Sequence, residues 1–357
     1  MDSMNRNNAI SYAKAICIVL MVLGHAGVPA RVHQFSCLFH MPLFFFVSGF
    51  LFKEKHLLSF IDFLKKKAKT IWQPYVLWTI FSILIHNAIL LPLHMADTEY
   101  SFQQILLKCI GALGMISTES YLFAGFWFLR DMFYALLVFW CVLRLSKRIR
   151  STAQSLFIPA TILLCLGMAI AVNAKWIWIP NVKTSTMLAL AYMLTGYLVR
   201  HSSLPLQHRH SLWIGLPVMC VVWLISGHFS TSMTIIEGSG DILLYYALSV
   251  FAVLGLLFLC DALSRKPMAA ISFIGEHSMD ILIFHFPAFK GLSYLLIRLK
   301  DYPIDDMAKF HIPGYWYYYA LIGLALPLSI SFLKAFCKTW PRGGKEACSG
   351  TKAGKSS

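Results

Sequence analysis

The sequence predicts an all-α integral membrane protein, a polytopic bundle of about ten transmembrane helices with both chain ends in the cytoplasm. Its composition is the first reason, because 58% of the 357 residues are hydrophobic and only 13% are charged. Soluble domains are closer to half apolar and a quarter charged. The mean hydropathy of +0.65 is the second reason. The third is that long apolar runs recur along the whole chain and leave no room for a soluble domain.

Ten apolar runs approach the length of about 20 residues that a helix needs to cross a bilayer. They cover residues 10–28, 36–52, 71–93, 126–143, 156–172, 186–199, 212–226, 242–260, 268–297 and 315–336. The first run has no convincing cleavage site, so we expect it to be retained as a helix. The ninth run is long and contains Pro287, where we expect the helix to bend or break. Segment 102–116 is short and amphipathic, which favours an outer-surface helix or a re-entrant piece over a span.

The basic residues predict the orientation of this membrane domain, which we place at residues 1–336. With the N-terminus inside, 21 of the 31 lysines and arginines fall on the cytoplasmic side and seven on the outer side. Cytoplasmic loops of membrane proteins carry such an excess, so both ends are expected inside. The same distribution, in short clusters between apolar runs, argues against nucleic acid as a partner despite the net charge of +15. The tail, residues 337–357, is rich in Gly, Ser and Lys and is expected to be a disordered cytoplasmic segment.

Small residues inside the runs are expected to serve helix packing. The nine cysteines form no CxxC pair, and most lie in apolar runs, so they indicate packing residues and no metal site. Ser48 and Gly49 in the second run would let a neighbouring helix approach closely.

Two ionisable residues in the first run, Lys14 and His25, are candidate catalytic residues. An ionisable side chain inside a span is costly, so it is a functional hypothesis by default. Their spacing of eleven residues puts them on one helix face, about 16 Å apart along the axis. The alternatives are that Lys14 reaches the inner headgroups and that His25 is an ordinary interfacial histidine. The pair on one face favours a functional role.

A basic cluster before the third run contains Lys65, Lys66, Lys67 and Lys69. One interpretation is topology signalling with contact to anionic membrane lipids. The other is a binding platform for phosphate, which lysine ammonium groups suit as point charges.

Polar residues near the outer ends of other runs are candidates for binding a substrate. His40 and His285 are expected at a depth similar to that of His25. Trp127 and Arg130 begin the fourth run and offer an aromatic and charged pair suited to a sugar. The alternatives are that Arg130 pairs with Asp131 and that the histidines join helices.

Five short patterns then occur in order between residues 11 and 287. They are Lys14 with ten residues before His25, the Phe-rich run ending in Ser48-Gly49-Phe50, the basic run ending in Pro74-Tyr75, Trp127-Phe128-Leu129, and Gly275-x-x-Ser278 before His285-x-Pro287. Together they resemble the acyltransferase-3 family of membrane acyltransferases, which includes polysaccharide O-acetyltransferases and fucose 4-O-acetylase-like enzymes. The chain departs from the family at Lys14, where arginine is common, and at Met279 and Leu282, where tyrosine is common.

The resemblance implies an O-acetyltransferase of the cell membrane, bacterial in type, that moves an acetyl group from cytosolic acyl-CoA to a glycan or lipid-linked sugar. No tightly bound cofactor is expected, since acetyl-CoA is the donor substrate. His25 would be the main catalytic residue, as a general base or as an acyl carrier, with Lys14 on the same face. The lysine cluster would hold the CoA phosphates. The rival hypothesis is a transporter or flippase for a lipid-linked glycan, which would use the same buried charges as a pathway.

Overall fold

The fold is all-helical, as predicted. The computed structural model describes residues 3–116, 122–149, 151–202, 210–229, 231–238 and 240–339. Across these segments the only β pairing is an isolated bridge between Ser232 and Ile235.

The α-helices have the following bounds. They are α1 (Ser3–Ala26), α2 (Ala30–Cys37), α3 (His40–Phe50), α4 (Phe60–Lys67), α5 (Gln73–Leu84), α6 (Phe102–Leu113), α7 (Trp127–Ser146), α8 (Ser151–Asn173), α9 (Thr184–His201), α10 (Ser211–Ser226), α11 (Asp241–Leu263), α12 (Ala269–Glu276), α13 (Ser278–Lys300) and α14 (Trp316–Thr339). Short 3₁₀ helices are η1 (Glu54–Leu57), η4 (Ala124–Phe126) and η5 (Ile304–Ala308), and π-helical turns are η2 (Ala68–Trp72) and η3 (His86–Leu90).

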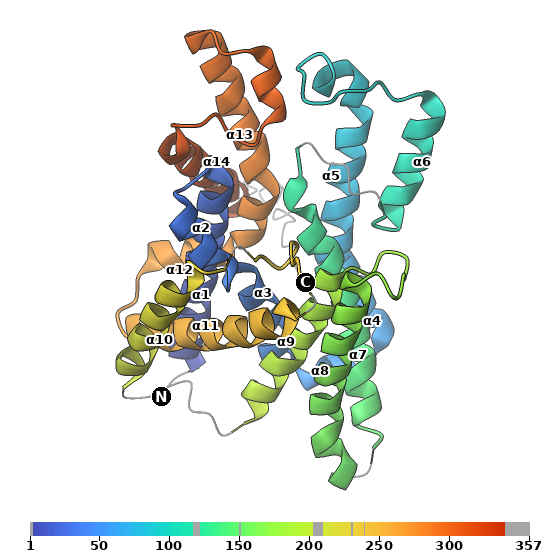
Figure 1. Cartoon of the computed structure of the whole chain (residues 1–357), viewed down its shortest axis with the longest axis vertical. Helices are drawn as coiled ribbons and strands as arrows, with labels where there is room; N and C mark the ends of the chain where they lie inside the picture. The colour runs from blue at the N-terminus through green and yellow to red at the C-terminus, as the bar shows by residue number, and fades with distance from the viewer. Residues whose placement is uncertain are drawn as a thin grey trace, which may run out of the picture.

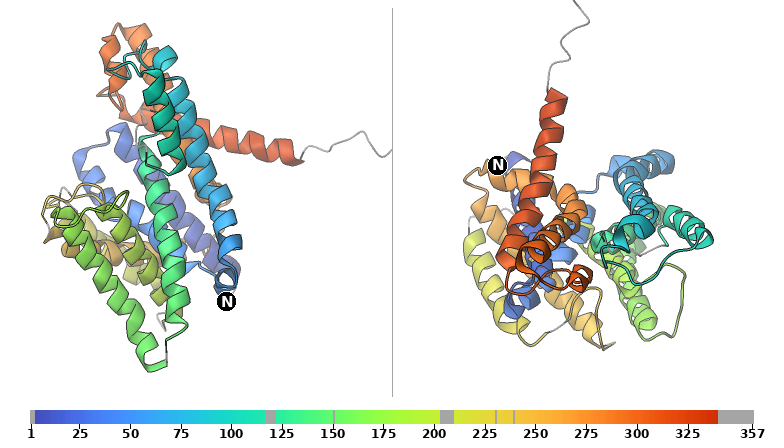
Figure 2. Two further views of the ribbon diagram at one scale, coloured as in Figure 1. Left: turned by 90° about the vertical axis from the view of Figure 1, so that its right-hand side faces the viewer. Right: turned by 90° about the horizontal axis from the view of Figure 1, so that it is seen from above.

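Helix α1 occupies a central position, because it packs against α2, α3, α11, α12, α13 and α14. Helices α7, α8 and α9 form a group that packs on α3 through α9, and α5 and α6 lie side by side as a pair (Figure 1). Helix α14 packs on α13 and then extends away from the other helices (Figure 2). The first apolar run therefore provides the helix around which the others gather.

Within the described residues, six helices are by length and composition long and apolar enough to cross a membrane. They lie at Asn8–Ala26, Ala124–Ser146, Ser155–Asn173, Asp241–Leu263, Ser278–Lys300 and Trp316–Cys337, with shorter apolar helices at Phe102–Leu113 and Ser211–Ser226. Large apolar side chains such as Leu163, Leu224 and Leu321 are about two-thirds exposed on the outer faces of α8, α10 and α14, which indicates contact with lipid. The total of ten spans and the cytoplasmic placement of both ends stay predictions.

The ninth run breaks at a different place from the one predicted. The chain interrupts its helix at His277, between α12 and α13, and the helix continues through Pro287. A Cβ on Gly275 would overlap the Ser11 carbonyl oxygen of α1, so α12 is pressed against α1 just before the break. Proline inside a membrane helix is tolerated where neighbouring groups satisfy the freed carbonyl.

The segment after the third run forms α6, only 12 residues long. Its start is a capping box, in which the Ser101 hydroxyl accepts from the Gln104 amide and the Gln104 side chain accepts from the Ser101 amide. The helix is too short to span a bilayer, while its position relative to the membrane stays a prediction. At the other end of the chain α14 continues to Thr339, and the rest of the predicted tail lies outside the described residues.

Glycines allow α3 and α9 to cross closely. A Cβ on Gly49 would overlap the Met193 carbonyl oxygen, and one on Gly196 would overlap the Phe46 carbonyl oxygen. Both obstacles are backbone atoms, so neither can turn aside as a side chain would. The close approach predicted at Gly49 is confirmed.

Candidate active site

One cavity, which we call the lysine cavity, has a volume of about 400 Å³ and lies between α1, α3, η2, α7 and α13. Most of its wall is apolar. Its polar and charged lining residues are Lys14, Ser48, His56, Lys67, Thr70, Glu276 and Ser278. Of its charged lining residues, Lys14 comes from α1 and Glu276 from the last turn of α12.

Among the four lysines of the basic cluster, only Lys67 lines this cavity. Lys65, Lys66 and Lys69 are exposed. Lys67 closes helix α4 just before the π turn η2, and its ammonium group lies 5.7 Å from the centre of the Phe63 ring. Burial, and secondly the neighbouring Lys66, lower the pKa of Lys67. Lys67 is thus a partly desolvated cation at the cavity wall.

His56 is a lining residue that sequence reasoning did not single out. Burial is the largest cause that lowers the pKa of its ring, followed by the surrounding lysines. The His56 carbonyl oxygen accepts a hydrogen bond of 2.8 Å from the Trp140 indole, which ties the η1 segment to α7. His56 therefore offers a neutral hydrogen-bonding ring to a ligand in the lysine cavity.

A second cavity, which we call the histidine cavity, has a volume of about 340 Å³. Four histidines line it together with a cysteine and aromatic residues. The chemically relevant lining residues are His25, His33, Cys37, His40, Trp127, Phe310 and His311. The structure thus brings together His25, His40 and Trp127, three of the residues singled out from the sequence, and adds His33 and His311.

Hydrogen bonds to backbone carbonyls determine which nitrogen of the histidines carries a proton. Nδ1 of His40 donates to the Ser36 carbonyl at 2.6 Å, and Nδ1 of His311 donates to the His25 carbonyl at 3.1 Å. A carbonyl oxygen can only accept, so each Nδ1 must be protonated. In the neutral rings Nε2 then remains as an acceptor. The contact from His311 also ties the segment before α14 to the end of α1.

His285 lies beside His25 and is not among the residues that line the cavity. The two rings are stacked, with centroids 5.5 Å apart and an interplanar angle of 27°. His285 is fully buried, and its Nδ1 donates to the carbonyls of Ile281 and Leu282, both at 3.0 Å. Its Nε2 is buried with no hydrogen-bond partner in the described part of the chain. An unpaired buried acceptor is costly, and the ring that carries this one is stacked on His25.

The two cavities share two wall residues, Met41 of α3 and Leu282 of α13. Lys14 and His25 come from the same helix, and each faces a different cavity. The arrangement therefore has two compartments separated by apolar side chains, with His25 on one side and two lysines on the other.

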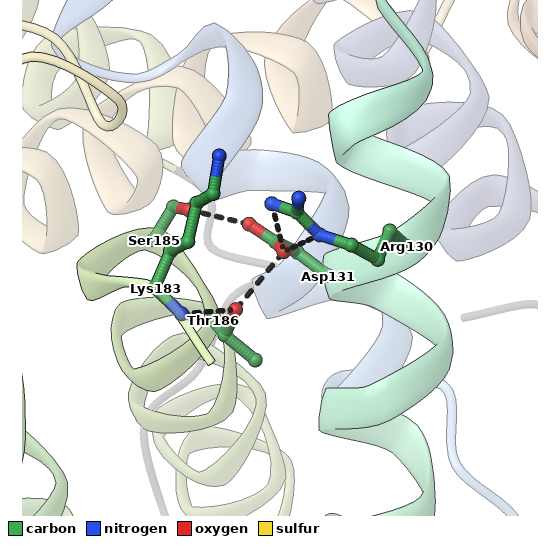
Figure 3. Close-up of polar contacts among 5 residues, drawn as sticks. All are labelled: Arg130, Asp131, Lys183, Ser185 and Thr186. Carbon is green, nitrogen blue, oxygen red and sulfur yellow. Dashed lines mark hydrogen bonds and ion pairs between the residues drawn. The ribbon is translucent and has the colours of Figure 1, made fainter. Parts of the chain in front are cut away.

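A third pocket, which we call the Arg130 pocket, has a volume of about 300 Å³ beside the histidine cavity. Arg130 is 2% exposed and donates from Nε and Nη2 to one carboxylate oxygen of Asp131, at 3.0 and 2.9 Å. The same carboxylate accepts from the hydroxyls of Ser185 and Thr186 at 2.5 and 2.9 Å, which joins α7 to the start of α9 (Figure 3). The alternative that Arg130 pairs with Asp131 is thus realised, and Arg130 nevertheless lines a pocket.

Sequence reasoning missed several lining residues for identifiable reasons. His311 lies in the connection between α13 and α14, and nothing in its local sequence links it to His25. The spacing of His33 and Cys37 was a usable signal, because residues four apart in a helix lie next to each other on one face. Their side chains are indeed in contact, with the Cys37 sulfur 3.4 Å from Nε2 of His33.

The protein is thus an all-helical membrane protein in which one helix, α1, contributes Lys14 to one cavity and His25 to another. Residues 7–334 match the family model described as an acyltransferase domain. The match covers essentially the whole chain, so the protein belongs to the acyltransferase-3 family and is a multi-pass membrane acyltransferase. No curated protein and no solved structure matches the chain.

Proposed function

We propose that the protein transfers an acetyl group from cytosolic acetyl-CoA to a hydroxyl of a cell-surface or exported glycan. The observation that carries the proposal is the pair of cavities that share Met41 and Leu282 as wall residues. A donor in the lysine cavity and an acceptor in the histidine cavity would meet at this shared wall, next to His25.

The lysine cavity suits the donor. Its mostly apolar wall fits the pantetheine arm of CoA, while Lys67 supplies a cation for a phosphate. Lys65, Lys66 and Lys69 are exposed on the same segment and would attract the CoA phosphates before the arm enters. Lys14 and His56 offer hydrogen-bond donors to the amide carbonyls of the arm.

His25 would act as the general base. It would take the proton of the acceptor hydroxyl as that oxygen forms a bond to the thioester carbon. The carbon–sulfur bond then breaks, and the CoA thiolate recovers the proton from His25. Histidine suits both transfers because it changes charge near neutral pH. Nε2 of His285, a buried acceptor beside the His25 ring, would stabilise the ring while it carries the extra proton.

The histidine cavity suits the acceptor. Trp127 provides an aromatic face on which a sugar ring can stack, and Nε2 of His40 provides an acceptor for a sugar hydroxyl. A transporter of the same glycan is not favoured, because the family is one of acyltransferases.

The test is acetyl transfer by purified protein in lipid nanodiscs, with labelled acetyl-CoA and glycans from the source cells. His25→Ala is expected to lower the rate by roughly 10² to 10⁴, the usual contribution of a general base. His94→Ala is the matched control, since His94 is half exposed and pairs with Asp305 at the surface. An undiminished rate in His25→Ala, in protein that remains folded, would show that the mechanism is wrong. Movement of unmodified glycan without use of acetyl-CoA would support a transporter instead.

A further inference from the structure

The Arg130 pocket is rich in positive charge that none of its described wall residues neutralises. Three cations line it, namely Arg130, Lys175 and Lys183. The other described lining residues are uncharged. The carboxylate of Asp131 behind Arg130 compensates one of the three charges, so the pocket keeps a net positive charge.

The guanidinium group of Arg130 is held ready for a further partner. Asp131 binds Nε and Nη2, whereas Nη1 makes no hydrogen bond with a described residue. Asp131 is itself fixed by Ser185 and Thr186, so the guanidinium group cannot turn away without breaking a buried network. A rigid guanidinium fork with a free edge is the usual means by which proteins bind carboxylate and phosphate.

The two lysines lie at the outer part of the same pocket and are exposed. Figure 3 shows the Lys183 ammonium group on the same side of the Asp131 network as the Arg130 guanidinium group. The pKa of Lys183 is lowered, first by burial and next by the charge of Arg130. These like charges repel one another across the pocket, and an anion bound between them would offset that repulsion.

The Arg130 pocket adjoins the histidine cavity. Trp127, Met233 and Thr234 line both spaces. A sugar stacked on Trp127 with its hydroxyl at His25 would therefore place a neighbouring substituent, or the next sugar, in the Arg130 pocket. Asn173, Thr184 and Ser185 add neutral hydrogen-bonding groups around that position.

We propose that the Arg130 pocket binds an anionic group of the acceptor, a carboxylate or a phosphate, so that the enzyme acts on an acidic glycan. The inference rests on the proposed function, since it identifies the class of acceptor for the same site. An anionic lipid headgroup presents the same chemistry, and the experiment separates the two sources.

The experiment uses the double variant Lys175→Gln/Lys183→Gln, which keeps side-chain length and leaves the Arg130–Asp131 pair intact. Lys300→Gln is the control for loss of a surface lysine, because Lys300 is exposed at the end of α13 and does not line the pocket. Acetyl transfer is measured on glycan from source cells lacking this protein, in its native form and after carboxyl reduction and phosphatase treatment. The double variant is expected to lose roughly five- to twentyfold in kcat/KM on native glycan, since each of two partly exposed charge contacts contributes modestly. It should equal wild type on the treated glycan, and Lys300→Gln should equal wild type on both.

Equal activity of wild-type protein on native and treated glycan would overturn the inference, as would an unchanged double variant. If wild-type protein labels no glycan, the proposed function fails, and a second measurement still tests the pocket. Calorimetry in phosphatidylcholine nanodiscs should then detect glucuronate and inorganic phosphate, but not glucose, with weaker binding to the double variant. Loss of glucuronate binding when phosphatidylglycerol is added, in wild type only, would assign the pocket to a lipid headgroup and overturn the acceptor assignment.

Discussion

Replacement of Asp131 by alanine is expected to destabilise the fold by about 3–5 kcal/mol, the usual cost of removing one partner from a buried ion pair. The Asp131 side chain is fully buried and accepts four hydrogen bonds, two from Arg130 and one each from Ser185 and Thr186. Alanine would leave a charged guanidinium group that is only 2% exposed without its counter-ion. The loss also falls on the junction between α7 and α9, which the hydrogen bonds from Ser185 and Thr186 to Asp131 connect.

The assay is thermal unfolding of the purified protein in detergent. With an unfolding entropy of about 2.1 cal/mol/K per residue, the expected loss corresponds to a fall in Tm of roughly 4–7 °C. Glu54→Ala is the control, since it removes an exposed pair with Lys147 and is expected to cost less than about 1 kcal/mol. The double variant Arg130→Met/Asp131→Leu should recover most of the stability, because it leaves no charge buried.

A Tm for Asp131→Ala no lower than that of Glu54→Ala would refute the reasoning. It would mean that Arg130 is reached by water when its partner is removed, and that the Arg130 pocket is far more open than its lining indicates. A double variant less stable than Asp131→Ala alone would also contradict it, since the main cost would then be lost packing and not an unpaired charge.

Two further variants test the donor side and the helix crossing. Lys67→Gln is expected to raise the KM for acetyl-CoA about tenfold, because a charge-assisted hydrogen bond is lost. Lys65 is exposed and outside the lysine cavity, so Lys65→Gln should change this KM less than twofold. Equal effects of the two variants would mean that the cluster acts only through its total charge. Gly196→Ala should lower Tm sharply, because its Cβ would overlap the α3 backbone. In the control, Gly167→Ala, the added Cβ meets open space and should leave Tm unchanged or higher. An unchanged Tm for Gly196→Ala would show that α3 and α9 are less closely packed than described.

The parts of the fold that are local in sequence could be predicted. Apolar runs indicate helices because buried or lipid-facing backbone must satisfy its own hydrogen bonds. The shared helix that carries Lys14 and His25 also follows from local periodicity. The close approach at Gly49 could be foreseen from residue size alone, although not the matching glycine, Gly196, about 150 residues away.

The parts of the site that depend on how each helix is rotated could not be predicted from the sequence. Four lysines in five residues point to most sides of a helix, so composition cannot tell that Lys67 alone lines the cavity. The π turn at Ala68–Trp72 adds to this difficulty, because it shifts the faces of α4 and α5 relative to each other. The helix break at His277 likewise depends on the close contact between Gly275 and α1. The local effect of proline, which predicted a bend or break at Pro287, does not take this contact into account.

The separation of the cations from His25 follows from the reaction that we propose. A lysine beside His25 would oppose the positive charge that the ring gains when it takes a proton. Lys14 lies about 16 Å away along α1 by helical rise, and the apolar side chains of Met41 and Leu282 lie between the two compartments. The group next to His25 is instead an uncharged ring, His285, with an unpaired acceptor nitrogen. Helix α1 thus contributes to both compartments, because eleven residues set Lys14 and His25 on the same face but in different cavities.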